Sequence, residues 1–175
     1  AAGRGSRMRP LTDNQPKPLL PVAGKPLLGY HLEKLANAGV NEVVINHAWH
    51  GEQIEDFVGD GSQWGLQVSF SKEPEGGLET AGGIRKALHH LGNEPFLVIN
   101  GDVACDWPLA RALQIASEWP QGQLAHLVMV PNPPHHLAGD FALLGSAVKQ
   151  PEPGETAFTF SGIGVYHPSL FSKLK

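Results

Sequence analysis

Cysteine is scarcer than any other residue that bears on redox or metal chemistry: Cys105 is the only one among 175 residues. A lone cysteine cannot form an internal disulfide, and no spacing of cysteine and histidine residues is typical of a zinc site. Both absences favour a reducing compartment. We therefore expect the protein to be cytoplasmic.

Basic runs and long apolar runs are missing as well. The formal net charge is -4, with 13 Lys and Arg residues against 17 Asp and Glu residues. This balance argues against nucleic acid or an anionic membrane surface as a partner. No apolar stretch is long enough to span a bilayer, and no signal peptide is visible. We expect neither nucleic acid nor a membrane as a partner.

The pattern that is present alternates apolar runs with amphipathic helical segments. Strands are predicted at residues 42–46, 66–70, 96–100, 124–130 and 158–165. Helices are predicted at residues 27–38, 51–58, 80–91 and 108–118, with a short one from residue 168. Such alternation predicts an α/β fold, a Rossmann-like mixed and mostly parallel sheet flanked by helices, whose ligand lies at the carboxyl ends of the strands. The length predicts one domain with a substantial core.

The amino end is rich in small residues that are followed by basic ones. Small residues let a backbone approach a ligand closely, and such a loop can turn several N–H groups toward anionic oxygens. Arg7 adds a planar donor fork and Lys17 a compact charge, which suits a triphosphate. A P-loop needs Gly-Lys-Ser/Thr and a dinucleotide fingerprint needs a glycine where Met8 stands, so neither applies. The predicted nucleotide-binding residues here are Ala1, Ala2, Gly3, Gly5, Ser6, Arg7 and Lys17.

A second chemical feature is Asn100-Gly101-Asp102, directly after the predicted strand at 96–100. A carboxylate at the carboxyl end of a buried strand faces the crevice in which this class of fold binds ligands. Mg²⁺ is commonly held by one or two carboxylates together with phosphate oxygens and water. Asp102 therefore suits a metal ligand. From the residues alone, a cap of the following turn is an equal alternative.

The opening stretch, with Pro10-Leu11-Thr12 and Pro16-Lys17-Pro18 a few residues on, resembles the signature of the sugar-1-phosphate nucleotidyltransferases. Weaker similarity continues through residues 46–47, 59–62, 139–141 and 160–163. The resemblance implies a single nucleotidyltransferase domain of the GT-A-like kind over residues 1–175. In that family this domain also has a strand before the opening loop and a further C-terminal part, so we expect the chain to lack both.

The resemblance also implies a reaction: a sugar 1-phosphate attacks the α-phosphorus of UTP and releases pyrophosphate. It implies Mg²⁺ as cofactor with Asp102 as its ligand, so that Arg7, Lys17 and Asp102 are the expected catalytic residues. A second metal-binding acid is expected beyond Lys175. A non-catalytic subunit that senses sugar nucleotides is the alternative of another class, and that acid would discriminate the two.

The segment at residues 73–83 resembles the part of the family that recognises the base. On this basis Glu73, Leu78 and Thr80 are expected to bind the nucleotide. Family members often have Gly where Glu79 stands, which leaves open whether Glu73 or Glu79 faces the nucleotide. A polar loop leading into a helix capped by Thr80 explains the same composition.

Later segments are similar to those that bound the sugar in the family. They supply the expected sugar-binding residues Gly139, Asp140, Ser161, Gly162, His135 and His136. The two histidines suit a carboxylate on the sugar. Without the resemblance, they are more simply loop histidines.

Residues 46–49, 78–80 and 134–136 are most similar to family members that join UTP to N-acetylmuramic acid 1-phosphate in recycling of the cell wall. The alternatives within the family are guanylyl transfer to mannose 1-phosphate and thymidylyl transfer to glucose 1-phosphate. We expect a monomer or a small homo-oligomer.

Overall fold

The computed structural model describes residues 2–172, and Ala1 and residues 173–175 lie outside the described part. The described helices are α1 (Leu27–Asn37), α2 (Gly51–Val58), α3 (Glu79–Leu91), α4 (Ala110–Ser117) and α5 (Ser169–Ser172). The strands are β1 (Pro21–Val22), β2 (Lys25–Pro26), β3 (Glu42–His47), β4 (Gln67–Lys72), β5 (Phe96–Ile99), β6 (Ala125–Val130), β7 (Phe141–Leu144), β8 (Ala147–Lys149) and β9 (Ala157–Tyr166). Short 3-10 turns lie at Ser6–Met8, Lys17–Leu19 and Ser62–Trp64.

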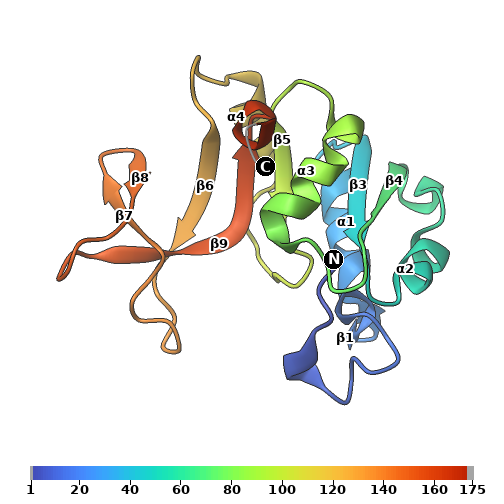
Figure 1. Ribbon diagram of the computed structural model, residues 1–175. Helices are drawn as coiled ribbons and strands as arrows, with labels where there is room; N and C mark the ends of the chain where they lie inside the picture. The colour runs from blue at the N-terminus through green and yellow to red at the C-terminus, as the bar shows by residue number, and fades with distance from the viewer. Residues whose placement is uncertain (1, 173–175) are drawn as a thin grey trace.

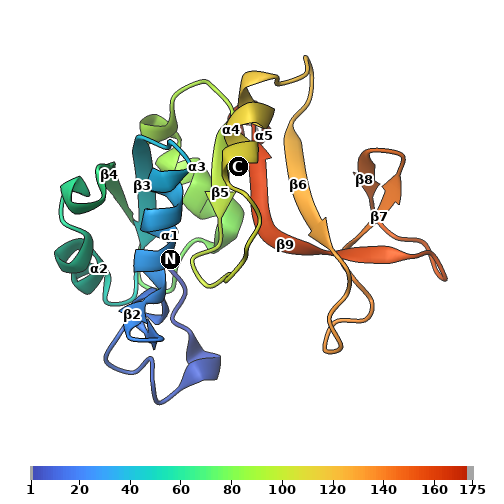
Figure 2. The same cartoon turned by 180° about the vertical axis from the view of Figure 1, so that it is seen from behind.

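Helix α1 follows directly from its sequence. Pro26 stands at its N-cap position, where a missing N–H costs nothing, and Gly39 follows its last turn with φ +87°. Leu28 and Leu32 are four residues apart, so both lie on the face that packs into the core. Figures 1 and 2 show α1 and α3 on opposite faces of the region around β3. The helix therefore fixes one side of the β3 layer.

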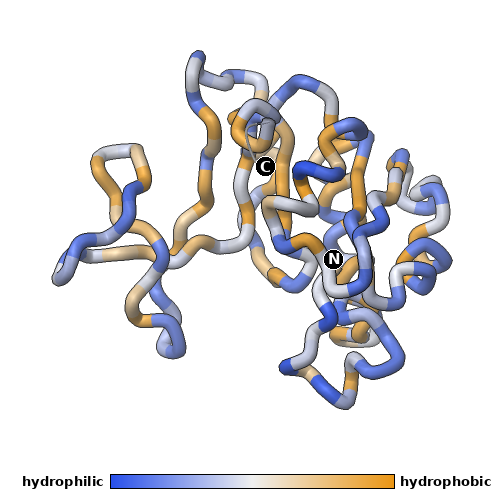
Figure 3. The backbone as a smooth tube through the Cα atoms, in the orientation of Figure 1, coloured by the Kyte–Doolittle hydropathy of each residue, from blue (hydrophilic) through white to orange (hydrophobic). Residues whose placement is uncertain are grey.

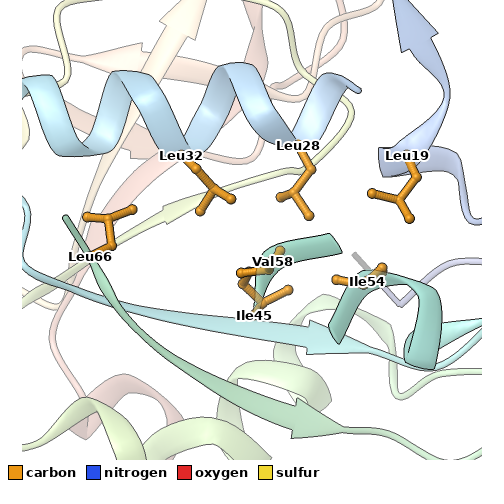
Figure 4. Packing of buried hydrophobic residues seen from close by; sticks show 7 residues of the cluster. All are labelled: Leu19, Leu28, Leu32, Ile45, Ile54, Val58 and Leu66. Atoms are coloured by element: carbon orange, nitrogen blue, oxygen red, sulfur yellow. The ribbon is translucent and has the colours of Figure 1, made fainter. Parts of the chain in front are cut away.

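One half of the molecule contains α1, α2, β3 and β4. Its core is one cluster of aliphatic side chains contributed by α1, α2, β3 and the loops beside them (Figure 4). Leu32 and Ile54 have no exposed surface, and Val58 is 1% exposed. The other members are Leu19, Leu28, Ile45 and Leu66. Strands β3 and β4 lie beside this cluster as a parallel pair, in register from Glu42 with Gln67 to His47 with Lys72.

Strand β9 organises the other half. Its carboxyl part pairs with β5 on one side and β6 on the other, and its beginning pairs with β7, which continues the sheet to β8. Figure 1 shows β9 bending away from the body, so that β7 and β8 stand apart from it. Gly162 lies in β9 with φ +81°, and a Cβ there would come within 2.8 Å of the Asn100 side chain. Glycine is thus required where the strand bends past the end of β5.

The α/β class and the mixed pairing of strands are confirmed. The expected excess of parallel pairs is not: within residues 2–172, β3 with β4 is parallel, and every other hydrogen-bonded pair is antiparallel. The run at 96–100 was expected to be a parallel strand because it is apolar without alternation. The structure pairs it antiparallel to β9, since a run buried on both faces carries no information about partner direction.

The hydropathy of the backbone differs between the two halves (Figure 3). Apolar segments are concentrated in the body, while apolar and polar segments alternate along the projecting β7–β8 region. Leu144, at the end of β7, is 70% exposed, and Leu137, in the loop before β7, is 76% exposed. The hairpin of β7 and β8 was not predicted from the sequence.

Candidate active site

The opening loop (residues 2–12) is shaped by Gly5 and Thr12. Gly5 has φ +66°, and a Cβ there would lie 3.1 Å from the Thr12 methyl carbon and 3.3 Å from Lys17 Cβ. Thr12 is 1% exposed, and its hydroxyl donates a hydrogen bond of 2.9 Å to the Gly5 carbonyl. The 3-10 turn Ser6–Met8 follows, closed by the hydrogen bond from Met8 N to Gly5 O at 2.8 Å. The loop is a compact turn that only glycine can begin.

The other predicted residues of this loop face outward. Gly3, Ser6 and Arg7 are exposed, and nothing lies within 4 Å of a Cβ built on Gly3. The guanidinium of Arg7 therefore stands on the accessible side of the turn. Ala1, also predicted to bind the nucleotide, lies outside the described residues.

Lys17 and Asp102, 85 residues apart in sequence, form an ion pair of 2.6 Å between Nζ and Oδ2. Lys17 begins the 3-10 turn Lys17–Leu19, and Asp102 lies in the turn after β5. Partial burial alone would raise the pKa of Asp102, but the hydrogen bond and charge of Lys17 hold that pKa below its usual value. The structure thus brings together two of the three residues predicted to be catalytic.

The turn that carries Asp102 rests on His31 of α1. His31 is 8% exposed and lies beside the Gly101 backbone, and its Nε2 is buried without a hydrogen-bond partner among the described residues. Burial lowers the pKa of His31, and the nearby Lys34 charge lowers it further, against the opposing effects of Asp102 and the Gly101 backbone. A neutral imidazole is therefore favoured beneath the Gly101–Asp102 turn. The sequence analysis missed His31 because a lone histidine on an amphipathic helix gives no functional signal.

Glu73 is a buried carboxylate, 4% exposed, at the end of β4. Its Oε1 accepts a hydrogen bond of 2.7 Å from Asn46 Nδ2, and its Oε2 accepts one of 2.7 Å from the Leu78 backbone N–H. A Cβ on Gly83 would lie 2.4 Å from Oε1, so α3 approaches this carboxylate only because position 83 has no side chain. Glu73 therefore fixes the turn at Gly77–Leu78 from the inside.

That turn lies beside the opening loop. A Cβ on Gly77 would lie 3.9 Å from both the carbonyl oxygen and the Cβ of Ala2. Of the two acids left open by the sequence, Glu73 is buried and Glu79 is exposed, with φ +59° at the start of α3. Thr80 does not cap α3: the N-cap residue is Leu78, without a side-chain cap hydrogen bond. The Glu73 carboxylate accepts the Leu78 N–H at the N-cap of α3, where no side-chain cap hydrogen bond is present, so it stabilises the start of this helix.

The predicted sugar-side residues form a polar cluster in the arm (residues 131–160). Asp140 Oδ1 lies 3.0 Å from His136 Nε2, and Oδ2 accepts a hydrogen bond of 2.8 Å from the Phe160 N–H. The hydrogen bond from the Phe160 N–H has the largest effect on the pKa of Asp140 and lowers it, and His136 lowers it further. Partial desolvation acts in the opposite direction, but the pKa stays below its usual value. Gly139, with φ +67°, packs against Ala157 and Asn132, where a Cβ would be 2.8 to 3.0 Å from its neighbours.

The remaining sugar-side predictions separate in the structure. His135 is exposed, while His136 pairs with Asp140, so the two histidines do not act as a matched pair. The hydroxyl of Ser161 accepts a 3.3 Å hydrogen bond from Ile163 N, and Gly162 is buried at the bend of β9. Gly162 therefore has a structural role in shaping the strand.

No group of three His, Cys, Asp or Glu residues within residues 2–172 is arranged to hold a metal ion. Across the same residues, none of the helices has both the length and the apolar character needed to cross a membrane. Among residues 2–172, Asp102 is the one carboxylate that forms an ion pair with Lys17.

Known proteins resemble the chain in both sequence and fold. The sequence model of the Nucleotidyl transferase family matches residues 1–139. The chain belongs to this family. The resemblance seen in the opening stretch is therefore confirmed.

Individual relatives agree. The chain is 57% identical over 176 residues to the N-acetylmuramate alpha-1-phosphate uridylyltransferase of Neisseria meningitidis serogroup B, covering 100% of this chain and 76% of that protein. It is 30% identical to the catalytic subunit beta of a mannose-1-phosphate guanylyltransferase from Drosophila melanogaster, covering 99% of this chain and 48% of that protein. The chain thus spans about half of the second relative.

Solved structures show the same fold. A Bacillus anthracis protein assigned as a glucose-1-phosphate thymidylyltransferase superposes with a TM-score of 0.86 at 21% identity, covering 100% of this chain and 73% of that one. An apo UDP-glucose pyrophosphorylase superposes with a TM-score of 0.76 at 22% identity, covering 98% of this chain and 76% of that one. The expected nucleotidyltransferase fold is confirmed.

Proposed function

We propose that the protein is an enzyme that joins UTP and N-acetylmuramic acid 1-phosphate to give the UDP-sugar and pyrophosphate, as a step in recycling of cell-wall sugars. The observation that carries this proposal is the 57% identity over the whole chain to a uridylyltransferase of that name. The Lys17–Asp102 pair and the exposed Arg7 of the opening loop support it, because the chemistry needs fixed charges around a triphosphate.

In the proposed reaction, a phosphate oxygen of the sugar 1-phosphate attacks the α-phosphorus of UTP and the bond to pyrophosphate breaks. Positioning and neutralisation of charge supply most of the catalysis, so no protein nucleophile is required. Arg7 binds the β- and γ-phosphates and stabilises the departing pyrophosphate. Lys17 neutralises charge between the two reacting phosphates. The backbone of residues 2–3 and the Gly77–Leu78 turn line the nucleoside.

Asp102 fits the Mg²⁺ that this family implies. It is partly exposed, and its pKa is held below the usual value, so it is ionised at neutral pH. One carboxylate with phosphate oxygens and water is a common Mg²⁺ environment. When bound, the ion neutralises charge on the phosphate oxygens. Lys17 orients the Asp102 carboxylate for that role, and His31 supports the turn behind it.

The proposed sugar site is the arm around Asp140 and His136. These side chains fix Gly139 and the start of β9, and the exposed His135 offers a hydrogen-bond donor to a sugar carboxylate. The protein is further proposed to be cytoplasmic, to act as a monomer or a small homo-oligomer, and to bind neither nucleic acid nor a membrane. The net charge of -4 supports the last two points.

Pyrophosphate release by the full-length protein tests this function. UTP, dTTP and GTP are each paired with the 1-phosphates of N-acetylmuramic acid, N-acetylglucosamine, glucose and mannose. We expect the highest kcat/KM for UTP with the muramic substrate. A higher value for GTP with mannose 1-phosphate, or for dTTP with glucose 1-phosphate, refutes the substrate and leaves the reaction class standing. Binding of UDP-sugar without turnover of any pair indicates a sensing subunit instead.

Replacing Asp102 tests the proposed metal ligand. Asp102→Asn keeps the shape of the side chain and removes its charge, so we expect a loss of roughly 100-fold or more in Mg²⁺-dependent kcat. UTP binding should persist, because Arg7 and the loop backbone remain. Asp106→Asn is the matched control in the same loop, and it should stay near wild-type activity. Full activity of Asp102→Asn refutes the assignment.

A further inference from the structure

Three side chains, two from the turn between β3 and α2 and one from α2 itself, contact three consecutive carbonyl oxygens at the end of the opening loop. The contacts are Trp49 Nε1 to Thr12 O at 3.0 Å, His50 Nε2 to Asp13 O at 3.2 Å, and Gln53 Nε2 to Asn14 O at 2.9 Å. The partners are 37 to 39 residues apart in sequence. These contacts fasten the opening segment to the scaffold by its backbone, whatever side chains that segment carries.

Trp49 makes a second contact, with the other end of the loop. The guanidinium carbon of Arg4 lies 4.3 Å from the centroid of the Trp49 ring, a cation–π geometry. One indole therefore touches both ends of the turn: its N–H holds Thr12, and its ring face holds Arg4. Gly5 and the Ser6–Met8 turn lie between these two points.

The contact with Thr12 is passed on to Gly5. Thr12 is 1% exposed, and its hydroxyl donates to the Gly5 carbonyl at 2.9 Å. Without the indole N–H, the buried Thr12 carbonyl loses this donor, which is costly for a group removed from water. Displacement of Thr12 would in turn release Gly5, whose left-handed conformation begins the turn that presents Arg7.

We infer that Trp49 is a positioning residue that holds the opening loop in the shape that receives the triphosphate. For the identity of that ligand, the inference rests on the proposed function. Trp49 itself touches no reacting atom. Its effect is preorganisation: a loop that is already ordered loses less entropy when it binds. The sequence alone contains no sign of this role, because the donor and its acceptors are far apart along the chain.

The test substitutes Trp49→Phe, which keeps a ring beside Arg4 and removes the donor to Thr12. Trp119→Phe is the matched control, because the Trp119 indole donates to the Gln123 carbonyl at 3.0 Å before β6, far along the chain from the opening loop. For Trp49→Phe we expect KM for UTP to rise roughly tenfold, with kcat changed by less than about twofold and KM for the sugar 1-phosphate unchanged. Trp119→Phe should leave all three constants unchanged.

A second measurement does not depend on turnover. Trypsin cleaves after exposed arginines, and Arg4 and Arg7 are exposed within the opening loop. In the full-length protein, we expect Trp49→Phe to speed cleavage at these two sites and to leave the rate of cleavage at other sites unchanged. Trp119→Phe should not change the rate of cleavage at Arg4 or Arg7. If wild-type protein does not use UTP, the proposed function fails, and the cleavage rates still decide the role of Trp49.

Thr12→Val provides an independent variant should Trp49→Phe not fold. It removes the hydroxyl bond to Gly5 and preserves side-chain volume, so it should raise both KM for UTP and the cleavage rate. In the double variant, the loss of binding free energy for UTP, taken from KM, should be smaller than the sum of the losses in the two single variants. Both substitutions act on the same series of contacts from Trp49 through Thr12 to Gly5. Unchanged cleavage and unchanged KM for UTP in both single variants overturn the inference. An equal rise of KM for both substrates in Trp49→Phe, which indicates general destabilisation, also overturns it.

Discussion

The half that carries the opening loop and the arm that carries β7 and β8 are held together by different interactions. The first rests on one closed aliphatic cluster in which Leu32 and Ile54 have no exposed surface. The arm leaves Leu144 70% exposed and is fastened by hydrogen bonds of Asn132 and Asp140 to the backbone around β9. A packed core tolerates little change in shape, whereas a few polar contacts can be rearranged one at a time.

This difference parallels the extent of the match to the family model. The family model ends at residue 139, where the arm's strands begin. Relatives that align over nearly all of this chain have different names: one is an N-acetylmuramate alpha-1-phosphate uridylyltransferase, and another is the catalytic subunit beta of a mannose-1-phosphate guanylyltransferase. In the proposed function the packed half binds the phosphates and the arm binds the sugar, so the polar contacts of the arm are the part that can diverge. The following predictions test that division.

The largest effect is expected from the core. Leu32→Ala removes a fully buried side chain from the aliphatic cluster, so the free energy of unfolding should fall by about 2–5 kcal/mol, from lost burial and the cavity left behind. Urea denaturation followed by circular dichroism measures this. Leu113→Ala, the same substitution on α4 where the side chain is 39% exposed, is the control and should cost under about 1 kcal/mol. Equal losses would show that the cluster is not the main source of stability.

Much of this body was predictable, because its signals are local. The helix expected at residues 27–38 is found at Leu27–Asn37, where apolar spacing, Pro26 and Gly39 mark it. The one expected at 80–91 is found at Glu79–Leu91, where apolar spacing and Gly92 mark it. The β7–β8 hairpin was missed, because its strands have only four and three residues on either side of Gly145. Short strands stabilised mainly by their neighbour leave little periodicity to detect.

The candidate site divides in the same way. The opening loop and Asp102 were predicted, because glycine runs and an acid after a strand are visible in the sequence. The roles of His31 and Trp49 required coordinates, since each lies against the backbone of a segment far away along the chain. The role of Glu73 required them because its partners are the Asn46 side chain and the Leu78 N–H. Backbone partners leave no complementary residue to recognise, and the Lys17–Asp102 pair joins groups 85 residues apart.

In the arm, Asp140→Asn should affect one substrate only. The substitution weakens a charge-assisted hydrogen bond to the Phe160 N–H and the contact with His136, so we expect KM for the sugar 1-phosphate to rise roughly threefold to tenfold. KM for UTP should remain at its wild-type value, because the opening loop is held by other residues. Glu152→Gln is the matched acid-to-amide control in the arm, at a side chain that is 80% exposed. A similar rise of KM for UTP would contradict the division into two halves.

Asp140 also predicts a dependence on pH. The pKa of Asp140 in the folded protein lies below its unfolded value, chiefly because of the Phe160 hydrogen bond. The contribution of Asp140 to stability is therefore present above the unfolded pKa of about 3.9 and is lost as the pH falls through the lower folded pKa. Urea midpoints of wild type and Asp140→Asn should therefore differ at about pH 6, and the difference should shrink as the pH falls below about 3.9. A constant difference across this range would show that the charge of Asp140 is not involved.

The smallest effect is expected at the tip of the arm. Leu144→Ser removes an apolar side chain that is 70% exposed, and little burial is lost with it, so the free energy of unfolding should change by less than about 0.5 kcal/mol. Activity toward both substrates should be unchanged, because Leu144 lies in β7 beyond the Asp140 contacts. Denaturation and steady-state kinetics measure the two quantities. A loss of stability above about 1 kcal/mol would mean that Leu144 is covered in solution, by another part of the full-length protein or by a second copy. The arm would then also be stabilised by apolar burial, and the two regions would no longer differ in the kind of interaction that holds them.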